Sequence, residues 1–154
     1  MAERYGDLEI EKISDDLQPP FKPSARTKAR KAALDILYQA ELRGRDPIQM
    51  LDDHTADADP PVRELTRALV RGYRQHASEI DRRIAECCPI EWTPERMPSL
   101  DRNIARIAVF EIDHSETETG VAISEAVTLA SQFSTEESAT FLNGLLAKAA
   151  STRA

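Results

Sequence analysis

The chain has 154 residues, a net charge of −7 and 41% hydrophobic residues, which is enough to close a single core without metals or disulfides. It contains only 5 glycines and is rich in alanine, leucine, arginine and glutamate, a composition that favours an all-α protein. The acidic balance argues against general nucleic-acid binding, because such domains are usually basic overall.

The sequence also gives little sign of a membrane span, a signal peptide or a disulfide. No apolar run approaches the length of a membrane span, and the charged N-terminus lacks the basic start and apolar centre of a signal peptide, so we expect a cytoplasmic protein. The only cysteines, Cys87 and Cys88, are adjacent, which makes a disulfide between them awkward and offers no spaced pair of metal ligands. We expect both to be reduced core or helix-end residues.

The first 23 residues predict a flexible acidic tail. They carry three basic and six acidic residues and contain the breakers Gly6, Pro19, Pro20 and Pro23. We expect one helical domain over residues 24–150 and a short C-terminal tail over 151–154.

The clearest amphipathic helix runs from Ser24 to Leu42. Ser24 is suited to cap its start, and Gly44 with the Asp46-Pro47 pair is suited to end it. Its apolar residues recur on one face at 3.6 residues per turn: Ala29, Ala33, Ile36, Leu37 and Ala40.

The start of this helix carries the only dense basic patch of the sequence, formed by Arg26, Lys28, Arg30 and Lys31. On a helical wheel that starts at Ala29, the apolar stripe spans about −20° to +80° and Tyr38 lies near 180°. An aromatic ring beside cations can stack a base while the cations neutralise phosphates, as in single-stranded RNA binding. From the residues alone, the favoured alternative is that Tyr38 packs on another helix and the bases only solvate the surface.

A further helix is predicted from Val62, and helical spacing continues as far as Cys87, with Gly72 as a candidate bend or break. The apolar residues fall at helical spacing: Val62, Leu65, Leu69, Tyr73, Ile80 and Ile84. The proline-rich loop from Pro89 to Pro98, which holds the single tryptophan, Trp92, then predicts the division between two small antiparallel bundles.

Three helices are predicted in the last third of the chain. Leu100 to Ile112 is apolar around nearly its whole circumference, which is typical of a central helix. Thr119 to Phe133 follows, and Ser134 to Glu137 predicts a capping box for the last helix. Gly144 lies inside that helix, where glycine costs roughly 1 kcal/mol relative to alanine, so we expect a close approach to its backbone. Tight packing on a neighbouring helix is favoured there over a surface on which Phe141 and Asn143 face a partner.

The sequence contains no recognisable catalytic site. His54, His76 and His114 are far apart and lack the spacing of metal ligands, so we expect solvated helix-end histidines, no metal site and no cofactor. Gly-rich phosphate loops and nucleophile elbows are absent from the sequence. We therefore expect no catalytic residues and a protein that is not an enzyme.

Four segments stand out in order along the chain: Ser24–Tyr38, Asp101–Glu111, Val121–Val127 and Phe141–Leu146. Taken together, they resemble the NusB family of bacterial transcription antitermination factors. The resemblance implies about seven helices in two packed three-helix bundles. It also implies binding of boxA-type single-stranded RNA together with a small-subunit ribosomal protein, NusE, in support of ribosomal RNA operon transcription, with other Nus factors and RNA polymerase as indirect partners.

Carried over position by position, the resemblance also implies functional residues. RNA contacts are expected for Arg26, Lys28, Arg30, Phe133 and Phe141, with Lys31 added on its charge. Contacts with the protein partner are expected for Tyr38, Asp101 and Glu137. Thr27 and Thr140 depart from the basic residues common at these positions in the family.

Two alternatives remain open at the level of sequence. Some RNA cytosine methyltransferases carry a NusB-like domain, so the chain could be a targeting module of such a system, although it shows no cofactor-binding βαβ pattern. The other alternative is a protein-binding helical scaffold without RNA. The sequence also leaves the oligomeric state open, with a homodimer as one option.

Overall fold

A computed structural model describes residues 22–89 and 91–153, and all regular structure in these ranges is helical. The predicted acidic tail lies outside the described residues, apart from its last two positions. The helices are α2 (Ala25–Arg43), α3 (Pro47–Asp57), α4 (Glu64–Gln75), α5 (Ala77–Cys87), the 3-10 turn η1 (Pro94–Arg96), α6 (Ser99–His114), α7 (Thr119–Phe133) and α8 (Glu136–Ser151). The all-α prediction with about seven helices is confirmed. None of the helices described is both long and apolar enough to cross a membrane.

The ends of α2 follow the local chemistry of the sequence. The Ser24 hydroxyl accepts a hydrogen bond from the Thr27 N–H at 3.1 Å and so caps the first turn, as predicted. Gly44 ends the helix with a left-handed φ of 64°, a conformation that glycine adopts at little cost. Asp46 then caps α3 by accepting from the Ile48 N–H at 3.0 Å.

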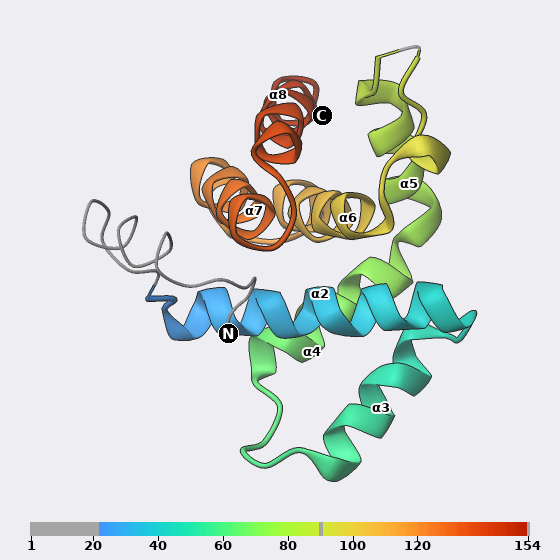
Figure 1. Cartoon of the computed structure of the whole chain (residues 1–154), viewed down its shortest axis with the longest axis vertical. Coiled ribbons are helices and arrows are strands. Elements are labelled where there is room, and N and C mark those ends of the chain that lie inside the picture. Colours follow the sequence, from blue (N-terminus) through green and yellow to red (C-terminus); the bar gives the residue numbers. More distant parts are fainter. Residues whose placement is uncertain (1–21, 90, 154) are drawn as a thin grey trace, which may run out of the picture.

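Helix α2 separates two groups of helices. In Figure 1 it runs across the middle of the molecule, with α3 and α4 on one side and α6, α7 and α8 on the other. Helix α6 packs on α2, α4, α5, α7 and α8, which confirms the prediction that the most apolar helix is central.

The division between the two groups falls at His76, between α4 and α5. Helix α5 packs mainly on α6 and α8, so it belongs with the C-terminal helices. The prediction of a division in the Pro89–Pro98 loop was therefore wrong, because the apolar face formed by Ile80 and Ile84 is buried against the C-terminal helices.

Gly72 does not break α4 but lies inside it, and the reason is packing. A Cβ atom at this position would lie 2.2 Å from the ring of Phe110 in α6. Gly144 shows the opposite, since a Cβ atom there would have nothing within 4 Å. The predicted close approach of a neighbouring helix at Gly144 was wrong, because Gly144 lies on the exposed face of α8.

Two predicted helix starts shift by one residue. Helix α6 begins at Ser99, one residue before the predicted Leu100, and its N-cap is Pro98. The cap of α8 is Thr135 rather than Ser134, and its hydroxyl accepts from the Ser138 N–H at 2.9 Å. Both cysteines are free, Cys87 being buried and Cys88 partly buried, as predicted.

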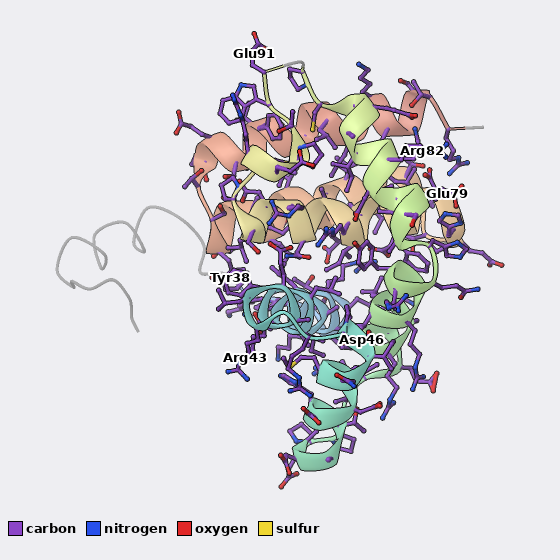
Figure 2. All side chains as sticks on the ribbon, turned by 90° about the vertical axis from the view of Figure 1, so that its right-hand side faces the viewer. Tyr38, Arg43, Asp46, Glu79, Arg82 and Glu91 are labelled. Atoms are coloured by element: carbon purple, nitrogen blue, oxygen red, sulfur yellow. The ribbon has the colours of Figure 1, made fainter. Side chains whose placement is uncertain are left out.

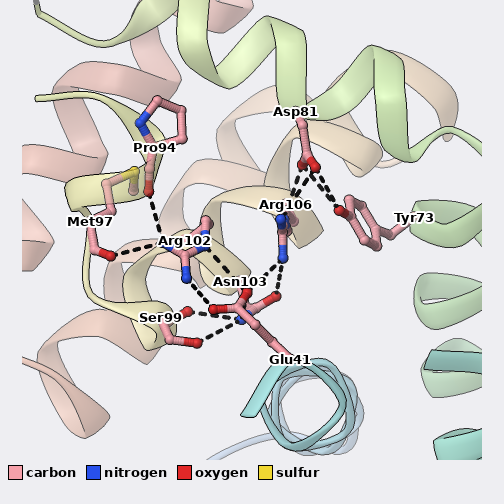
Figure 3. A network of polar contacts seen from close by, with 9 residues as sticks. All are labelled: Glu41, Tyr73, Asp81, Pro94, Met97, Ser99, Arg102, Asn103 and Arg106. Carbon is pink, nitrogen blue, oxygen red and sulfur yellow. Dashed lines mark hydrogen bonds and ion pairs between the residues drawn. The ribbon is translucent and has the colours of Figure 1, made fainter. Parts of the chain in front are cut away.

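A polar network fixes the C-terminal half of α2 against the C-terminal group (Figure 3). Glu41 of α2 pairs with Arg102 and with Arg106 of α6, the latter at 2.9 Å. Arg106 also pairs with Asp81 of α5 at 3.0 Å, and the Tyr73 hydroxyl of α4 donates to the same carboxylate. Burial raises the pKa of Glu41, but hydrogen bonds from Arg102 and Ser99 and the charges of Arg102 and Arg106 outweigh it and lower the pKa to about 2.

Candidate nucleic-acid interface

The first two turns of α2 present cations to solvent. Arg26 and Lys28 are exposed, and Lys31 is partly exposed. The Lys31 Nζ lies 4.6 Å from the ring centroid of Phe133 at the end of α7 and pairs with Asp35 at 2.9 Å. Phe133 remains 40% exposed. The structure thus places a cationic helix start beside a solvent-facing aromatic ring, a combination that can hold both phosphates and a base.

Arg30 does not belong to this exposed basic surface. Its side chain is 2% exposed, and its Nε and Nη2 donate to the two Glu111 oxygens at 2.9 and 2.8 Å. The hydrogen bond to Glu111 raises the pKa of Arg30 against the opposing effect of burial. The predicted RNA contact of Arg30 is therefore corrected: its guanidinium is engaged inside the protein and not available to a phosphate.

The physical reason lies in the helical wheel. Arg30 falls near 100° on the wheel used above, next to Leu37 at about 80°, so it borders the apolar stripe that packs on α6. The RNA contact of Arg30 was implied by the family resemblance, although the angular position of this residue already placed it beside the core.

Thr27, which interrupts the basic run, is also buried. Its hydroxyl donates to Glu125 Oε1 of α7 at 2.8 Å, and Arg30 Nη1 lies 3.3 Å from the same oxygen. The threonine thus joins α2 to α7 at a position where a longer basic side chain would have to displace this contact.

A second surface lies where the loop before η1 meets the start of α8. The rings of Trp92 and Phe141 stand 5.7 Å apart and flank a cavity of about 590 Å³. The cavity is lined by Trp92, Met97, Pro98, Asp101, Ser134, Thr135, Glu137, Ser138 and Phe141. Trp92 is 52% exposed, and sequence reasoning did not assign it to a site, although a single tryptophan in a proline-rich loop was a usable signal.

Asp101 and Glu137 behave differently within this cavity. Asp101 is buried and accepts hydrogen bonds from the Ser134 and Ser138 hydroxyls, at 2.7 and 2.5 Å. Its predicted direct contact with a protein partner is therefore corrected, because its carboxylate holds the start of α8 against α6. Glu137 is exposed, so its predicted partner contact stays a prediction.

Tyr38 lies on the outer side of α2, as Figure 2 shows. It is partly exposed and stands outside the hydrophobic core. Tyr38 follows Lys31 by seven residues, about 10 Å along the helix axis. The structure therefore brings Lys31 and Phe133 together, and Phe141 and Glu137 together, with Tyr38 further along α2.

The histidines depart from the sequence prediction. His76 and His114 were expected to be separate solvated residues, but their rings are stacked with centroids 3.8 Å apart. The turn between α4 and α5 brings His76 against the end of α6, and the sequence gives no local sign of this pairing.

Comparison with known proteins gives a consistent result. Residues 27–151 match the NusB family. The transcription antitermination protein NusB of Acidothermus cellulolyticus is 52% identical over 124 residues, which cover 80% of this chain and 85% of that protein. The protein of the same name from Cutibacterium acnes is 44% identical over 94% of this chain, which spans only 56% of that relative's length.

Solved structures agree with the sequence comparison. NusB of T. maritima superposes with a TM-score of 0.76 at 28% identity, covering 86% of this chain and 95% of that one. A crystal structure of the antitermination factors NusB and NusE in complex with dsRNA superposes with a TM-score of 0.72 at 25% identity, covering 82% of this chain and 96% of that one.

Proposed function

Because this chain belongs to the NusB family, we propose that it is a transcription antitermination factor that binds boxA-type single-stranded RNA together with the ribosomal protein NusE. The observation that carries the proposal is the exposed cationic start of α2 beside the Phe133 ring. A related NusB has been solved with NusE and RNA, which supports the same pair of partners here.

The cationic surface supplies affinity rather than sequence selection. Arg26, Lys28 and Lys31 neutralise phosphates, because contacts to phosphate oxygens position a nucleic acid without reading its bases. Phe133 offers its face to an unstacked base, next to the Lys31 ammonium. Arg30 acts indirectly by holding α2 against α6 and α7, so that the three cations keep their places.

The cavity beside Phe141 is the proposed meeting point of RNA and NusE. Phe141 and Trp92 provide two aromatic faces, and Glu137 provides an exposed carboxylate at the same cavity. Phe141 then contacts RNA and Glu137 the ribosomal protein, while Asp101 positions the α7–α8 turn that forms the wall. Tyr38 extends the protein-partner surface along α2.

In this role the protein is an adaptor without catalytic residues, built on one helical domain over residues 24–150. It acts on nascent RNA in the cytoplasm, notably on ribosomal RNA operons, and reaches RNA polymerase through NusE and other Nus factors. A homodimer that covers the RNA surface would compete with this role.

A gel-shift titration of the full chain with boxA-like RNA and with a scrambled RNA, each with and without NusE, tests the proposal. We expect NusE to tighten binding to the boxA-like RNA and to have little effect on the scrambled one. Phe141→Ala should reduce this gain, whereas Thr140→Ala, an exposed neighbour on the same helix, should not. Equal binding of both RNAs regardless of NusE would contradict it, and NusE binding with no RNA dependence would indicate a protein-only scaffold.

A further inference from the structure

The joint between α4 and α5 holds a cluster of candidate metal ligands that the RNA-binding surface does not use. One ligand atom each from His76, Glu79 and His114 lies within 4.8 Å of the others. His76 is the single residue between α4 and α5, Glu79 lies in the first turn of α5, and His114 is the last residue of α6. The cluster therefore joins the two groups of helices at the point where the chain passes between them.

The distances suit a small four-coordinate cation. The Glu79 Oε1 lies 3.3 Å from His114 Nε2 and 3.8 Å from His76 Nδ1. Around tetrahedral zinc, with bonds of about 2.0–2.2 Å, neighbouring ligand atoms stand about 3.4 Å apart. The third pair of ligand atoms, from His76 and His114, lies within 4.8 Å. A metal bonds in the plane of each imidazole, so one of the two stacked rings has to turn out of the stack for all three atoms to reach one ion, with the fourth position open to water.

The Nε2 of His114 is a buried nitrogen without a hydrogen-bond partner, although it lies near the Glu79 carboxylate. Buried polar atoms in proteins are almost always satisfied, so an orphaned imidazole nitrogen calls for a ligand. A cation between His114 and Glu79 would provide it. Access is open from the Glu79 side, since that side chain is 51% exposed; Figure 2 shows it on the outer side of α5.

The rings of His76 and His114 lie next to one another and beside the ring of Phe110. The two imidazoles are stacked within 9° of parallel, and Phe110 lies 6.4 Å from His76 and 6.1 Å from His114 by ring centroids. Phe110 can lie there because Gly72 leaves room for it against α4. His114 also ends α6, where the partial negative charge of the helix C-terminus favours a cation.

We propose that His76, Glu79 and His114 form a binding site for Zn²⁺, which pins the α4–α5 joint to the end of α6. Imidazole nitrogens with one carboxylate form a donor set that suits zinc, and copper or nickel would bind the same ligands. The site stiffens the connection between the two groups of helices and is independent of the RNA-binding proposal.

Calorimetric titration of the untagged, chelator-treated full chain with zinc chloride tests the site. We expect one equivalent to bind and to raise the thermal unfolding temperature. His76→Gln and His114→Gln should each weaken binding at least about tenfold. His54→Gln is the matched control, because His54 lies in α3 with its Nδ1 3.1 Å from the Met50 carbonyl oxygen, and it should bind as the wild type does.

A second measurement guards against variants that fold poorly. In the unmodified protein, zinc should shift the imidazole NMR signals of His76 and His114 and leave those of His54 unchanged. Absence of saturable binding up to about 1 mM zinc would overturn the proposal, because a site with three ligands should bind zinc at least as tightly as scattered surface imidazoles do. Binding that survives both glutamine variants, or that is lost in Cys88→Ser, would overturn it as well.

Discussion

Arg30 of α2 and Glu111 of α6 stand 81 positions apart in the sequence and form a two-pronged ion pair inside the protein, with side chains 2% and 1% exposed. The pair is reinforced by Glu125 of α7 and by the Thr117 hydroxyl, which donates to Glu111 at 2.9 Å. The basic residues at the start of α2 thus have two different roles. Arg30 holds helices together inside the protein, whereas the neighbouring cations face solvent.

The buried pair predicts a strong effect on stability. Arg30→Met would leave the Glu111 carboxylate buried without its counter-charge, so we expect a loss of about 3–5 kcal/mol in the free energy of unfolding. Urea denaturation measures this loss. Arg26→Met, a change at an exposed position, is the control and should cost about 0.5 kcal/mol or less. The double change Arg30→Met with Glu111→Leu should recover much of the loss. Equal effects of Arg30→Met and Arg26→Met would contradict the assignment.

The exposed cations predict an effect on RNA binding and its salt dependence. Arg26→Ala combined with Lys28→Ala should weaken binding and reduce the slope of log affinity against log salt by about 0.7 for each phosphate that is no longer neutralised. Fluorescence anisotropy over a salt series provides the slope. Arg71→Ala, an exposed change on α4, is the control and should leave it unchanged. An unaltered slope in the double variant would rule out phosphate binding at these positions.

The two helical glycines predict opposite outcomes for the same substitution. Gly72→Ala places a methyl group against Phe110 and should destabilise the fold by about 1–3 kcal/mol. Gly144→Ala meets open space and should stabilise α8 by up to about 1 kcal/mol, because alanine is the better helix former. Thermal unfolding of both variants tests the pair. Destabilisation by Gly144→Ala would indicate a close neighbour that the structure does not show.

The Glu41 network predicts a pH dependence. The pKa of Glu41 is lowered to about 2 in the folded protein, below that of an ordinary glutamate. Its contribution is therefore complete above the unfolded pKa and is lost as the pH falls from about 5 towards 2. Its side chain is 27% exposed, so solvent reduces the contribution to about 2 kcal/mol.

Unfolding free energies of Glu41→Gln measured between pH 7 and pH 3 test this dependence. The variant should be less stable at pH 7 and lose less stability on acidification than the wild type. Glu116→Gln, an exposed change in the loop between α6 and α7, serves as the control and should follow the wild type. Parallel pH profiles for wild type and Glu41→Gln would contradict the role of the network.

Local chemistry accounts for most of what the sequence determined by itself. The cap at Ser24, the turn at Gly44, the range of α7 and the central place of α6 follow from side-chain hydrogen bonding, backbone freedom and the spacing of apolar residues. These signals lie within one or two helical turns, so they can be read without knowing the neighbours. The resemblance of four segments likewise identified the family that the comparisons confirm.

Tertiary structure alone decided which groups meet across helices. Nothing near Arg30 in the sequence announces Glu111, and nothing near His76 announces His114, because each partner comes from a different helix. The same holds for Gly72, where the Phe110 ring leaves no room for a Cβ atom. It holds as well for Trp92, whose neighbour at the cavity is Phe141. Periodicity tells which face of a helix is buried, but the identity of what covers that face depends on how the helices pack.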